Sequence, residues 1–362
     1  MPPFRGQELG VAVDLRGCPN RCRHCGLGDP AGAKLSANDL RWAVGRFREF
    51  VTGPENTTPI RQLAVSSWGY EPDYDDGYRN LHAIEKELGD TGPYRYELLS
   101  IWRLARDASY AAWAKEVGPD TCQLTLFGME EVTDWFYRRK GAFQDALTAT
   151  ERLLEIGMKP RWQLFFTTRL IPDLPDFLDM VDRLRLRDRV AALGGRFDLF
   201  LHTPGPFGRA MDIEALRPAL CHLEALPAKI VETTMAHFGE SKLRWRTEAQ
   251  LVSEITRDGD VFPYAYSYPE RFWMFVKSNW DVFSNLGACD EWWRLGNLHS
   301  DSVADILERF EQNICPGLHT IHTVPPTELA ARYGDPEGKK IYTSKDDLLS
   351  LYVRRYCQEI AT

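Results

Sequence analysis

Strand-like runs alternate with helix-like runs from the N-terminus to residue 210, and no other feature of this 362-residue chain constrains its fold more strongly. The expected strands are 8–15, 61–66, 96–101, 122–127, 161–167 and 197–202. The expected helices are 39–51, 78–88, 108–117, 142–156 and 175–186. A repeated strand and helix is typical of a parallel sheet covered by helices. Six such strands predict an α/β protein built as a partial (β/α)6 barrel.

The pattern changes beyond residue 215. We expect helices at 216–228, 248–257, 302–313 and 345–360. Residues 272–283 are dense in aromatic and β-forming residues, whereas 326–341 carry proline, glycine and charge. The sequence therefore predicts two parts, a partial barrel of residues 1–215 and a C-terminal α+β extension of residues 216–362.

Composition and charge exclude several classes of protein. The net charge is −8 and no basic stripe is visible, so we expect no nucleic-acid partner. No apolar run has the ~18 residues needed to span a bilayer, so we expect no membrane segment. The first residues lack the apolar stretch of a signal peptide, which predicts a cytoplasmic protein. Eight cysteines in such a chain favour metal or catalytic thiols over disulfides.

Three closely spaced cysteines follow the first expected strand. Cys18, Cys22 and Cys25 have the spacing Cys-x3-Cys-x2-Cys, in a loop able to surround a cluster. In α/β barrels the functional groups lie at the C-terminal ends of strands, where this loop falls. Iron–sulfur clusters are normally bound by four thiolates, so three thiolates leave one iron with an open position. We interpret these cysteines as ligands of a [4Fe–4S] cluster. A structural zinc site would need a fourth ligand at suitable spacing. His24 lies between two of the cysteines and is therefore poorly placed to bind the same metal ion.

This spacing resembles the radical S-adenosylmethionine (SAM) superfamily. The resemblance implies a [4Fe–4S] cluster and SAM as cofactors, with SAM chelating the open iron. It implies that an electron cleaves the S–C5′ bond of SAM and that the 5′-deoxyadenosyl radical removes a hydrogen atom from an unactivated C–H bond. The implied partners are a small-molecule substrate and an external electron donor of the flavodoxin or ferredoxin type.

The resemblance also assigns SAM contacts. Gly69, Tyr70 and Glu71 follow the second expected strand, where the superfamily has a Gly-Gly-Glu-Pro segment that binds the methionine amino group; Tyr70 replaces its second glycine. His24 occupies the position of an aromatic residue that packs on adenine. Thr125 matches a hydroxyl residue that contacts the ribose.

One of two neighbouring arginines completes this set of expected SAM contacts. Arg138 or Arg139 matches an arginine that binds the SAM carboxylate, for which a guanidinium offers two parallel charge-assisted hydrogen bonds. The alternative is that both arginines are ordinary exposed residues at the start of a helix, so their role in binding SAM stays open.

The C-terminal part resembles the SPASM or Twitch extensions of the superfamily, which carry cysteines for auxiliary clusters. Asn285 stands where such a ligand is expected. The other cysteines lack paired spacings, although one auxiliary cluster is conceivable from Cys221, Cys289, Cys315 and Cys357.

A lone cysteine in this part is similar to that of the radical SAM sugar epimerases of antibiotic biosynthesis. There a thiol returns a hydrogen atom to the face opposite the abstraction, and Cys289 is the matching candidate. A buried apolar role is the alternative for a free cysteine. The leading hypothesis is a radical SAM epimerase, an isomerase acting on a sugar-containing metabolite. The competing hypotheses are an alcohol dehydrogenase, a peptide-modifying enzyme with an auxiliary cluster, and a non-catalytic iron–sulfur or zinc protein.

Overall fold

The computed structural model describes residues 8–14, 18–28, 34–51, 60–67, 76–92, 98–118, 120–259, 271–284 and 289–361. Its strands are β1 (Glu8–Val13), β2 (Gln62–Ser66), β3 (Thr121–Leu126), β4 (Lys159–Phe165), β5 (Leu199–His202), β6 (Arg246–Thr247), β7 (Arg271–Val276), β8 (Asp281–Phe283), β9 (Arg294–Asn297) and β10 (Ile341–Tyr342). Two sheets dominate, in the orders β2-β1-β7-β8-β9 and β3-β4-β5, and a small antiparallel sheet joins β10 to β6.

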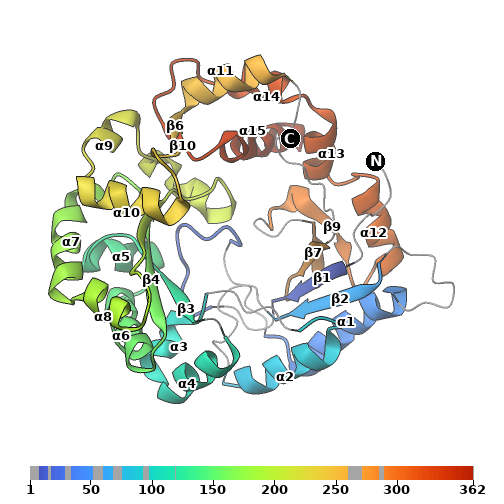
Figure 1. Cartoon of the computed structure of the whole chain (residues 1–362). Coiled ribbons are helices and arrows are strands. Elements are labelled where there is room, and N and C mark those ends of the chain that lie inside the picture. Colours follow the sequence, from blue (N-terminus) through green and yellow to red (C-terminus); the bar gives the residue numbers. More distant parts are fainter. Residues whose placement is uncertain are drawn as a thin grey trace.

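Parallel strands line the inside of the molecule and helices cover the outside. β1 pairs in parallel with β2 and β7, and β4 pairs in parallel with β3 and β5. The two sheets face each other within a ring of helices (Figure 1). The α/β class and the partial-barrel architecture predicted from the sequence are therefore confirmed.

Most helices begin and end close to their expected positions. The helices before β6 are α1 (Ala37–Val51), α2 (Tyr78–Leu88), α3 (Ile101–Arg106), α4 (Ala108–Val117), α5 (Glu130–Tyr137), α6 (Ala142–Glu155), α7 (Leu174–Arg183), α8 (Leu186–Ala192), α9 (Leu220–Glu224) and α10 (Ala228–Phe238). The later ones are α11 (Glu248–Asp258), α12 (Val303–Glu311), α13 (Pro316–Thr323), α14 (Pro326–Tyr333) and α15 (Lys345–Ile360). In the described part of the chain, the 3-10 helices are η2 (Ile171–Asp173), η3 (Gly208–Leu216) and η4 (Glu291–Trp293). Within the described residues, no helix combines the length and apolarity needed to cross a membrane.

The structure has no strand in the described part of the range 96–101, where one was expected. Positions 96 and 97 lie outside the described residues, and Ile101 begins α3 instead. Ser100 is the N-cap of that helix, because its hydroxyl accepts a hydrogen bond from the N–H of Arg103 at 3.2 Å. A capping serine that satisfies a free N–H favours the helix over an extended run.

Prolines explain two further differences from expectation. The helix expected at 216–228 is replaced by the short α9 and by α10, which begins directly after Pro227. A proline disfavours helical backbone at the preceding residue, so one continuous helix cannot pass this position. Pro326 opens α14 inside the segment 326–341, for which no helix was expected, because the first helical turn tolerates a missing N–H.

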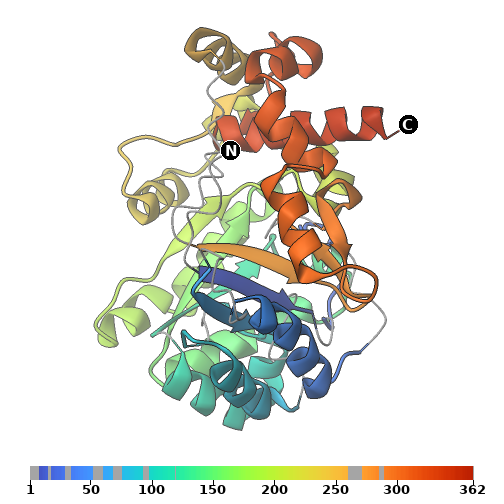
Figure 2. The same cartoon turned by 90° about the vertical axis from the view of Figure 1, so that its right-hand side faces the viewer.

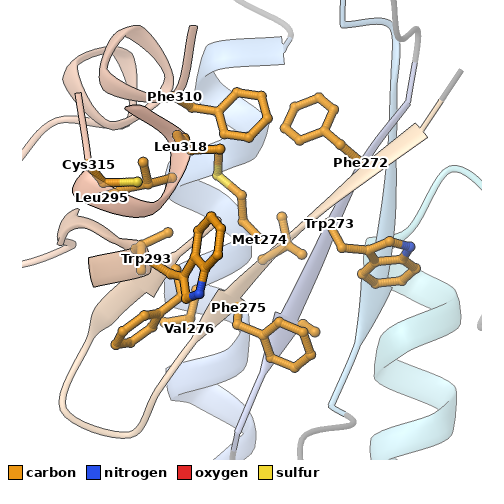
Figure 3. Packing of buried hydrophobic residues seen from close by; sticks show 14 of the residues in the cluster. Phe272, Trp273, Met274, Phe275, Val276, Trp293, Leu295, Phe310, Cys315 and Leu318 are labelled. Carbon is orange, nitrogen blue, oxygen red and sulfur yellow. The ribbon is translucent and has the colours of Figure 1, made fainter. Parts of the chain in front are cut away.

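β7 joins the sheet of β1 although it lies in the C-terminal part of the chain. Phe272 stacks on Phe310 of α12 at 5.2 Å between ring centroids, and the indole of Trp273 lies over Gly10 of β1 (Figure 3). A Cβ at Gly10 would lie 2.2 Å from that indole, so the close approach requires glycine. The division predicted at residue 215 stays a prediction, since residues on both sides of it share this core.

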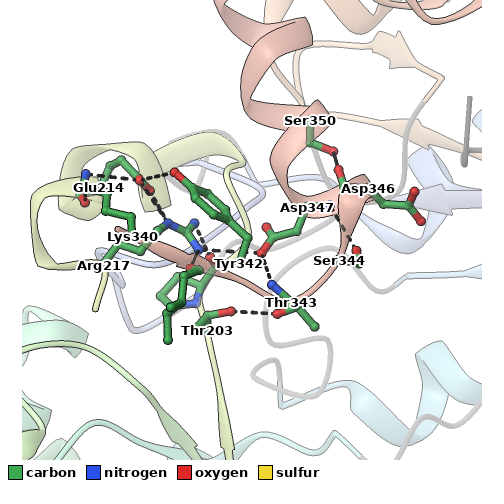
Figure 4. A network of polar contacts seen from close by, with 12 residues as sticks. Thr203, Glu214, Arg217, Lys340, Tyr342, Thr343, Ser344, Asp346, Asp347 and Ser350 are labelled. Carbon is green, nitrogen blue, oxygen red and sulfur yellow. Dashed lines mark hydrogen bonds and ion pairs between the residues drawn. The ribbon is translucent and has the colours of Figure 1, made fainter. Parts of the chain in front are cut away.

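A buried arginine connects the C-terminal helix to the barrel. Arg217 forms an ion pair with Glu214 at 2.8 Å, lies 3.6 Å from a carboxylate oxygen of Asp347 in α15, and donates to the carbonyl oxygen of Pro204 at 3.0 Å (Figure 4). Its guanidinium also lies over the ring of Tyr342, 4.3 Å from the centroid. The helices α11, α14 and α15 lie together beyond one end of the strands (Figure 2), and this arginine lies where they meet the loop after β5.

Candidate active site around the cysteine loop

The cysteine loop, residues 18–25, rests on the C-terminal end of α5. The N–H of Arg21 donates to the carbonyl oxygen of Tyr137 at 3.3 Å, and the N–H of Arg23 donates to that of Phe136 at 2.8 Å. The last carbonyls of a helix have no partner within the helix, so the loop satisfies groups that α5 leaves free. The loop is thereby fixed above β3, whose chain continues into α5.

A glycine allows a second segment to approach the loop. Gly208 has a φ of +49°, and a Cβ there would lie 2.3 Å from the carbonyl oxygen of Gly26. The next residue, Arg209, donates its N–H to the carbonyl oxygen of Cys25 at 3.0 Å. Both the left-handed backbone and the close contact require glycine at this position.

The chemistry of the loop fits a cluster. All three cysteines are reduced and partly exposed, and Cys18 accepts the N–H of Asn20 at a sulfur–nitrogen distance of 3.4 Å. Among the described residues, no three ligating side chains group closely enough for a single metal ion. The N–H of Cys25 donates to the carbonyl oxygen of Cys22 at 3.1 Å, so a backbone turn holds these two cysteines on one short loop. Cysteine thiolates are the ligands that iron–sulfur clusters use.

His24 lies between two phenylalanines from the ends of β3 and β4. Its ring centroid is 4.7 Å from that of Phe127 and 4.6 Å from that of Phe165. Burial lowers the pKa of His24 to about 3, so the imidazole is neutral at pH 7. The ring is partly exposed, while its buried Nδ1 has no hydrogen-bond partner among the residues that the structure describes. An aromatic surface with an unsatisfied polar atom fits a heterocyclic base, and the expected role in packing on adenine stays a prediction.

His202, at the end of β5, titrates far below its usual range. Burial lowers its pKa from 6.5 to about 4, and a hydrogen bond with the Thr203 backbone offsets only part of that shift. Between pH 6.5 and pH 4 the unfolded chain binds a proton at this histidine that the folded protein excludes. Acid therefore lowers the free energy of unfolding, and this decrease levels off below about pH 4. We expect His202→Gln to reduce the loss of unfolding free energy between pH 7 and pH 5 by about 2 kcal/mol.

This prediction is checked by urea unfolding of the wild type and the variant at both pH values. His319→Gln, at an exposed position of α13, is the matched control for replacing a histidine with glutamine. An unchanged pH dependence in His202→Gln contradicts the assignment.

Thr125 belongs to a row of polar side chains on the inner face of the barrel. Its hydroxyl donates to Oε1 of Gln163 at 3.3 Å, and Nε2 of Gln123 donates to the same atom at 2.8 Å. Nε of Arg161 continues the row by donating to Oε1 of Gln123 at 3.2 Å. Sequence analysis missed all but the threonine, although β3 alternates strictly between these polar residues and the buried Cys122, Leu124 and Leu126. Whether Thr125 binds a ribose stays a prediction.

The two candidate arginines have different surroundings. Arg139 donates from Nε to Oδ1 of Asn20 at 2.6 Å and pairs with Asp145 of α6 at 2.7 Å, so it fastens the cysteine loop to that helix. Arg138 caps α5 in a left-handed conformation, with a φ of +53°, and is exposed. A carboxylate contact from either residue stays a prediction.

The predicted SAM segment Gly69, Tyr70 and Glu71 lies outside the described residues. The structure describes what precedes it. Both the N–H and the hydroxyl of Ser67 donate to Oε1 of the buried Glu85 in α2, the N–H at 2.6 Å. The end of β2 is therefore firmly held where that segment begins.

Cys289 lies close to the cysteine loop. Burial raises the pKa of its thiol to about 12, and the charges of Lys277, Asp290, Asp14 and Cys25 all act on it. Asp14 and Lys277 directly follow β1 and β7, whose last residues are paired side by side. The thiol therefore lies near the C-terminal ends of these strands, on the side of Cys25, and stays protonated at neutral pH.

Asp290 holds this cysteine in place. Its carboxylate accepts a hydrogen bond from the backbone of Gly208 and pairs with Arg354 of α15 at 3.2 Å. Arg354 in turn lies over the ring of Trp292, 5.0 Å from its centroid. Three segments far apart in the sequence thus meet beside Cys289, and sequence analysis did not identify Asp290 or Arg354 as a pair.

The remaining thiols of the C-terminal part lie in different surroundings. Cys221 is exposed, whereas Cys315 and Cys357 are buried. Cys315 lies beside Ser284 and among Leu295 and Leu318 (Figure 3). Such enclosed thiols behave as small apolar side chains, and burial raises their pKa.

No protein-family profile and no curated protein sequence matches the chain. Among solved structures, anSMEcpe with bound AdoMet and Cp18Cys peptide is similar at a TM-score of 0.53 and 12% identity, over 98% of this chain and 99% of that one. Hexahistidine-tagged anSMEcpe with bound AdoMet matches at 0.51 and 13% identity, over 87% and 80%. Streptococcus suis SuiB bound to S-adenosylmethionine gives 0.46 and 13% identity, over 88% and 68%. This chain therefore has the fold of anSMEcpe along nearly its whole length.

Proposed function

We propose that this chain is a radical SAM enzyme. The observation that carries the proposal is the loop of Cys18, Cys22 and Cys25, which lies at the C-terminal end of β1 in a fold shared with a protein solved with bound AdoMet. A [4Fe–4S] cluster bound there, together with SAM, supplies a radical able to remove a hydrogen atom from an unactivated carbon. The protein positions the substrate carbon and excludes competing reactions.

We propose further that the reaction is an epimerisation in which Cys289 returns the hydrogen atom. The high pKa of this thiol keeps the S–H bond intact at neutral pH, beside the loop that would bind the cluster. The substrate carbon loses a hydrogen atom to the radical, forming 5′-deoxyadenosine, and then takes one from sulfur. The sulfur radical left behind needs one electron and one proton from the external donor before the next turnover.

Two substrate classes suit this reaction. A sugar-containing metabolite is the first candidate, because a single thiol donor is typical of the sugar epimerases that the sequence resembles. A peptide is the second, and it is favoured by the likeness to anSMEcpe, which was solved with a bound peptide. In both cases the C-terminal part, which contributes Cys289, Asp290 and Arg354, would cover the active site.

The first test measures iron, sulfide and SAM cleavage by the wild-type protein after anaerobic reconstitution. We expect about four irons per chain, the content of one [4Fe–4S] cluster, and 5′-deoxyadenosine formed only when that cluster is reduced. Absence of 5′-deoxyadenosine from the fully loaded, reduced protein would refute the proposal. About eight irons would make Cys289 a ligand of a second cluster and would contradict the epimerisation.

The second test identifies the substrate class. The loaded enzyme is incubated with SAM, reductant and a fractionated cell extract in D₂O, where the Cys289 thiol exchanges its hydrogen with solvent. The product then carries one deuterium on the inverted carbon, and mass spectrometry of the labelled fraction shows whether it is a sugar-containing metabolite or a peptide.

A further inference from the structure

A chain of hydrogen bonds joins β3 to β4 on the inner face of the barrel. We name it the amide row and define it by Gln123, Thr125, Arg161 and Gln163. Strand register places Gln123 opposite Arg161 and Thr125 opposite Gln163. Gln123 and Thr125 are partly exposed, whereas the apolar residues that alternate with them in β3 are buried under the outer helices. The amide row therefore faces the interior of the barrel.

The side-chain amide of Gln163 has a fixed orientation. Its Oε1 accepts a hydrogen bond from Nε2 of Gln123 at 2.8 Å and another from the hydroxyl of Thr125 at 3.3 Å. Gln123 is held in turn by Arg161, whose Nε donates to Oε1 of Gln123 at 3.2 Å. Because two donors meet at one oxygen, the nitrogen of the Gln163 amide is turned away from both of them.

Nε2 of Gln163 is the unpaired end of the amide row. Gln163 is only 9% exposed, and no residue that the structure describes accepts a hydrogen bond from this nitrogen. An enclosed donor without an acceptor is disfavoured, so a bound molecule that supplies the acceptor is stabilised here. Thr125 adds an acceptor beside this donor, because its single hydroxyl hydrogen is already donated to Gln163.

The donor and the acceptor together specify the chemical group that fits between them. A hydroxyl accepts a hydrogen bond from Nε2 of Gln163 and donates its own hydrogen to the oxygen of Thr125. A carboxylate or a carbonyl only accepts, so it would meet the threonine oxygen without a hydrogen to share. The geometry therefore favours a hydroxylated ligand.

Aromatic rings lie at the level of Gln163 on the next strand. Gln163 pairs in register with Phe200 of β5, and the imidazole of His237 stacks on Phe200 with 3.7 Å between the ring centroids and 7° between the planes. Burial lowers the pKa of His237, so its ring is neutral at pH 7. A sugar presents hydroxyls at its edge and an apolar face, which suits an amide beside flat, uncharged rings.

We propose that Gln163 donates a hydrogen bond from Nε2 to a hydroxyl of the substrate, and that this contact selects a sugar-containing metabolite over a peptide. Gln123 is a positioning residue that acts by orienting the Gln163 amide. The inference rests on the proposed function, since it names the substrate class of that reaction and a residue that recognises it.

The position of Gln163 agrees with a role in binding substrate. Thr125 is the expected contact of the SAM ribose, and the radical carbon C5′ is attached to that ribose. A reacting substrate carbon must approach C5′ to within about 3–3.5 Å. Gln163 lies on the strand beside Thr125, and Gln123 lies two residues farther from the cysteine-loop end of β3, so both adjoin the place that the substrate must occupy.

The test removes the donor while keeping the hydrogen bonds that hold the side chain. In Gln163→Glu the carboxylate still accepts from Gln123 and Thr125 but has no N–H to offer. Gln163→Met is a second variant, which removes the donor without adding a charge. Gln144→Leu, at an exposed position of α6, is the matched control. Each protein is loaded with the cluster and SAM and kept oxidised, so that no turnover occurs.

Two probes are compared by saturation-transfer NMR. Methyl β-D-glucopyranoside carries hydroxyls on a ring, whereas N-acetylglycine N-methylamide carries peptide groups and no hydroxyl. The affinity for SAM is measured in parallel by equilibrium dialysis.

We expect the wild type and Gln144→Leu to bind the glycoside in preference to the peptide probe. Both Gln163 variants should bind the glycoside about tenfold more weakly, the loss that one hydrogen bond accounts for. The dissociation constant for SAM should stay within about twofold in every variant.

Equal glycoside affinity in the wild type and both Gln163 variants, or no glycoside binding by the wild type, would overturn the hydroxyl contact. Preference of the wild type for the peptide probe would overturn the choice of substrate class. A tenfold loss of SAM affinity in both Gln163 variants would place the amide against the ribose and overturn its assignment to the substrate. A wild-type enzyme that binds the glycoside yet forms no 5′-deoxyadenosine when reduced would refute the proposed function and leave the hydroxyl contact supported.

Discussion

Cys289→Ala is expected to stop formation of the inverted product while 5′-deoxyadenosine continues to form. The thiol is the proposed source of the returned hydrogen atom, and alanine removes it without adding bulk near Cys25. Without the thiol the substrate radical has no hydrogen-atom donor on the opposite face, so inverted product should not exceed background. Hydrogen abstraction precedes the return step, so SAM cleavage should stay within about twofold of wild type.

The measurement quantifies inverted product and 5′-deoxyadenosine in the same reaction. Cys221→Ala, which removes an exposed thiol, should leave both unchanged and controls for general effects of losing a cysteine. Wild-type product formation by Cys289→Ala would remove this residue from the mechanism. Loss of SAM cleavage together with product would show that Cys289 contributes to the cluster site itself.

Arg217→Met should lower the free energy of unfolding by about 3–5 kcal/mol, because it leaves buried carboxylates without their counter-charge. Arg217 is 6% exposed and its partners Glu214 and Asp347 are also largely enclosed (Figure 4). Burial already raises the pKa of Asp347, and removal of the guanidinium raises it further. Equilibrium urea unfolding measures the loss.

A matched variant separates burial from charge. Arg257→Met removes an arginine that pairs with Asp258 at an exposed site, and it should cost no more than about 1 kcal/mol. Arg217→Lys keeps the charge but loses the hydrogen bonds to Pro204 and Ile341, so we expect an intermediate loss. Equal effects of Arg217→Met and Arg257→Met would contradict the proposed importance of the buried network.

Local sequence patterns predicted individual helices and strands, because each of these is formed by residues that are neighbours in the sequence. The strand expected at 122–127 is β3, which differs from it by one residue at each end, and the helix expected at 345–360 is α15. A capping box opens α1: the N–H of Ser36 donates to Oδ2 of Asp39 at 2.6 Å, and the N–H of Asp39 donates to Oγ of Ser36 at 3.2 Å. The cysteine spacing pointed to the loop around which the site is built.

Features that depend on distant residues were not predicted. The contact of Trp273 with Gly10 depends on pairing between strands from opposite ends of the chain, and no local pattern encodes that pairing. The bond of Asp290 with Arg354 and the buried position of Arg217 likewise join segments that only the tertiary structure brings together. Sequence patterns thus located the loop that we expect to bind the cluster, while its surroundings required the structure.

The pairing of β7 with β1 has a consequence for how the site forms during synthesis. β1 is made first, yet its register from Glu8↔Arg271 to Val13↔Val276 is complete only after most of the chain has been made. Closing so long a loop slows folding, because its entropy is lost before the new contacts repay it. Until then one edge of β1 remains unpaired and open to association with other chains. The loop of Cys18, Cys22 and Cys25 therefore follows a strand that is paired on one side only until the C-terminal part is made, and we expect the site around it to form late in synthesis.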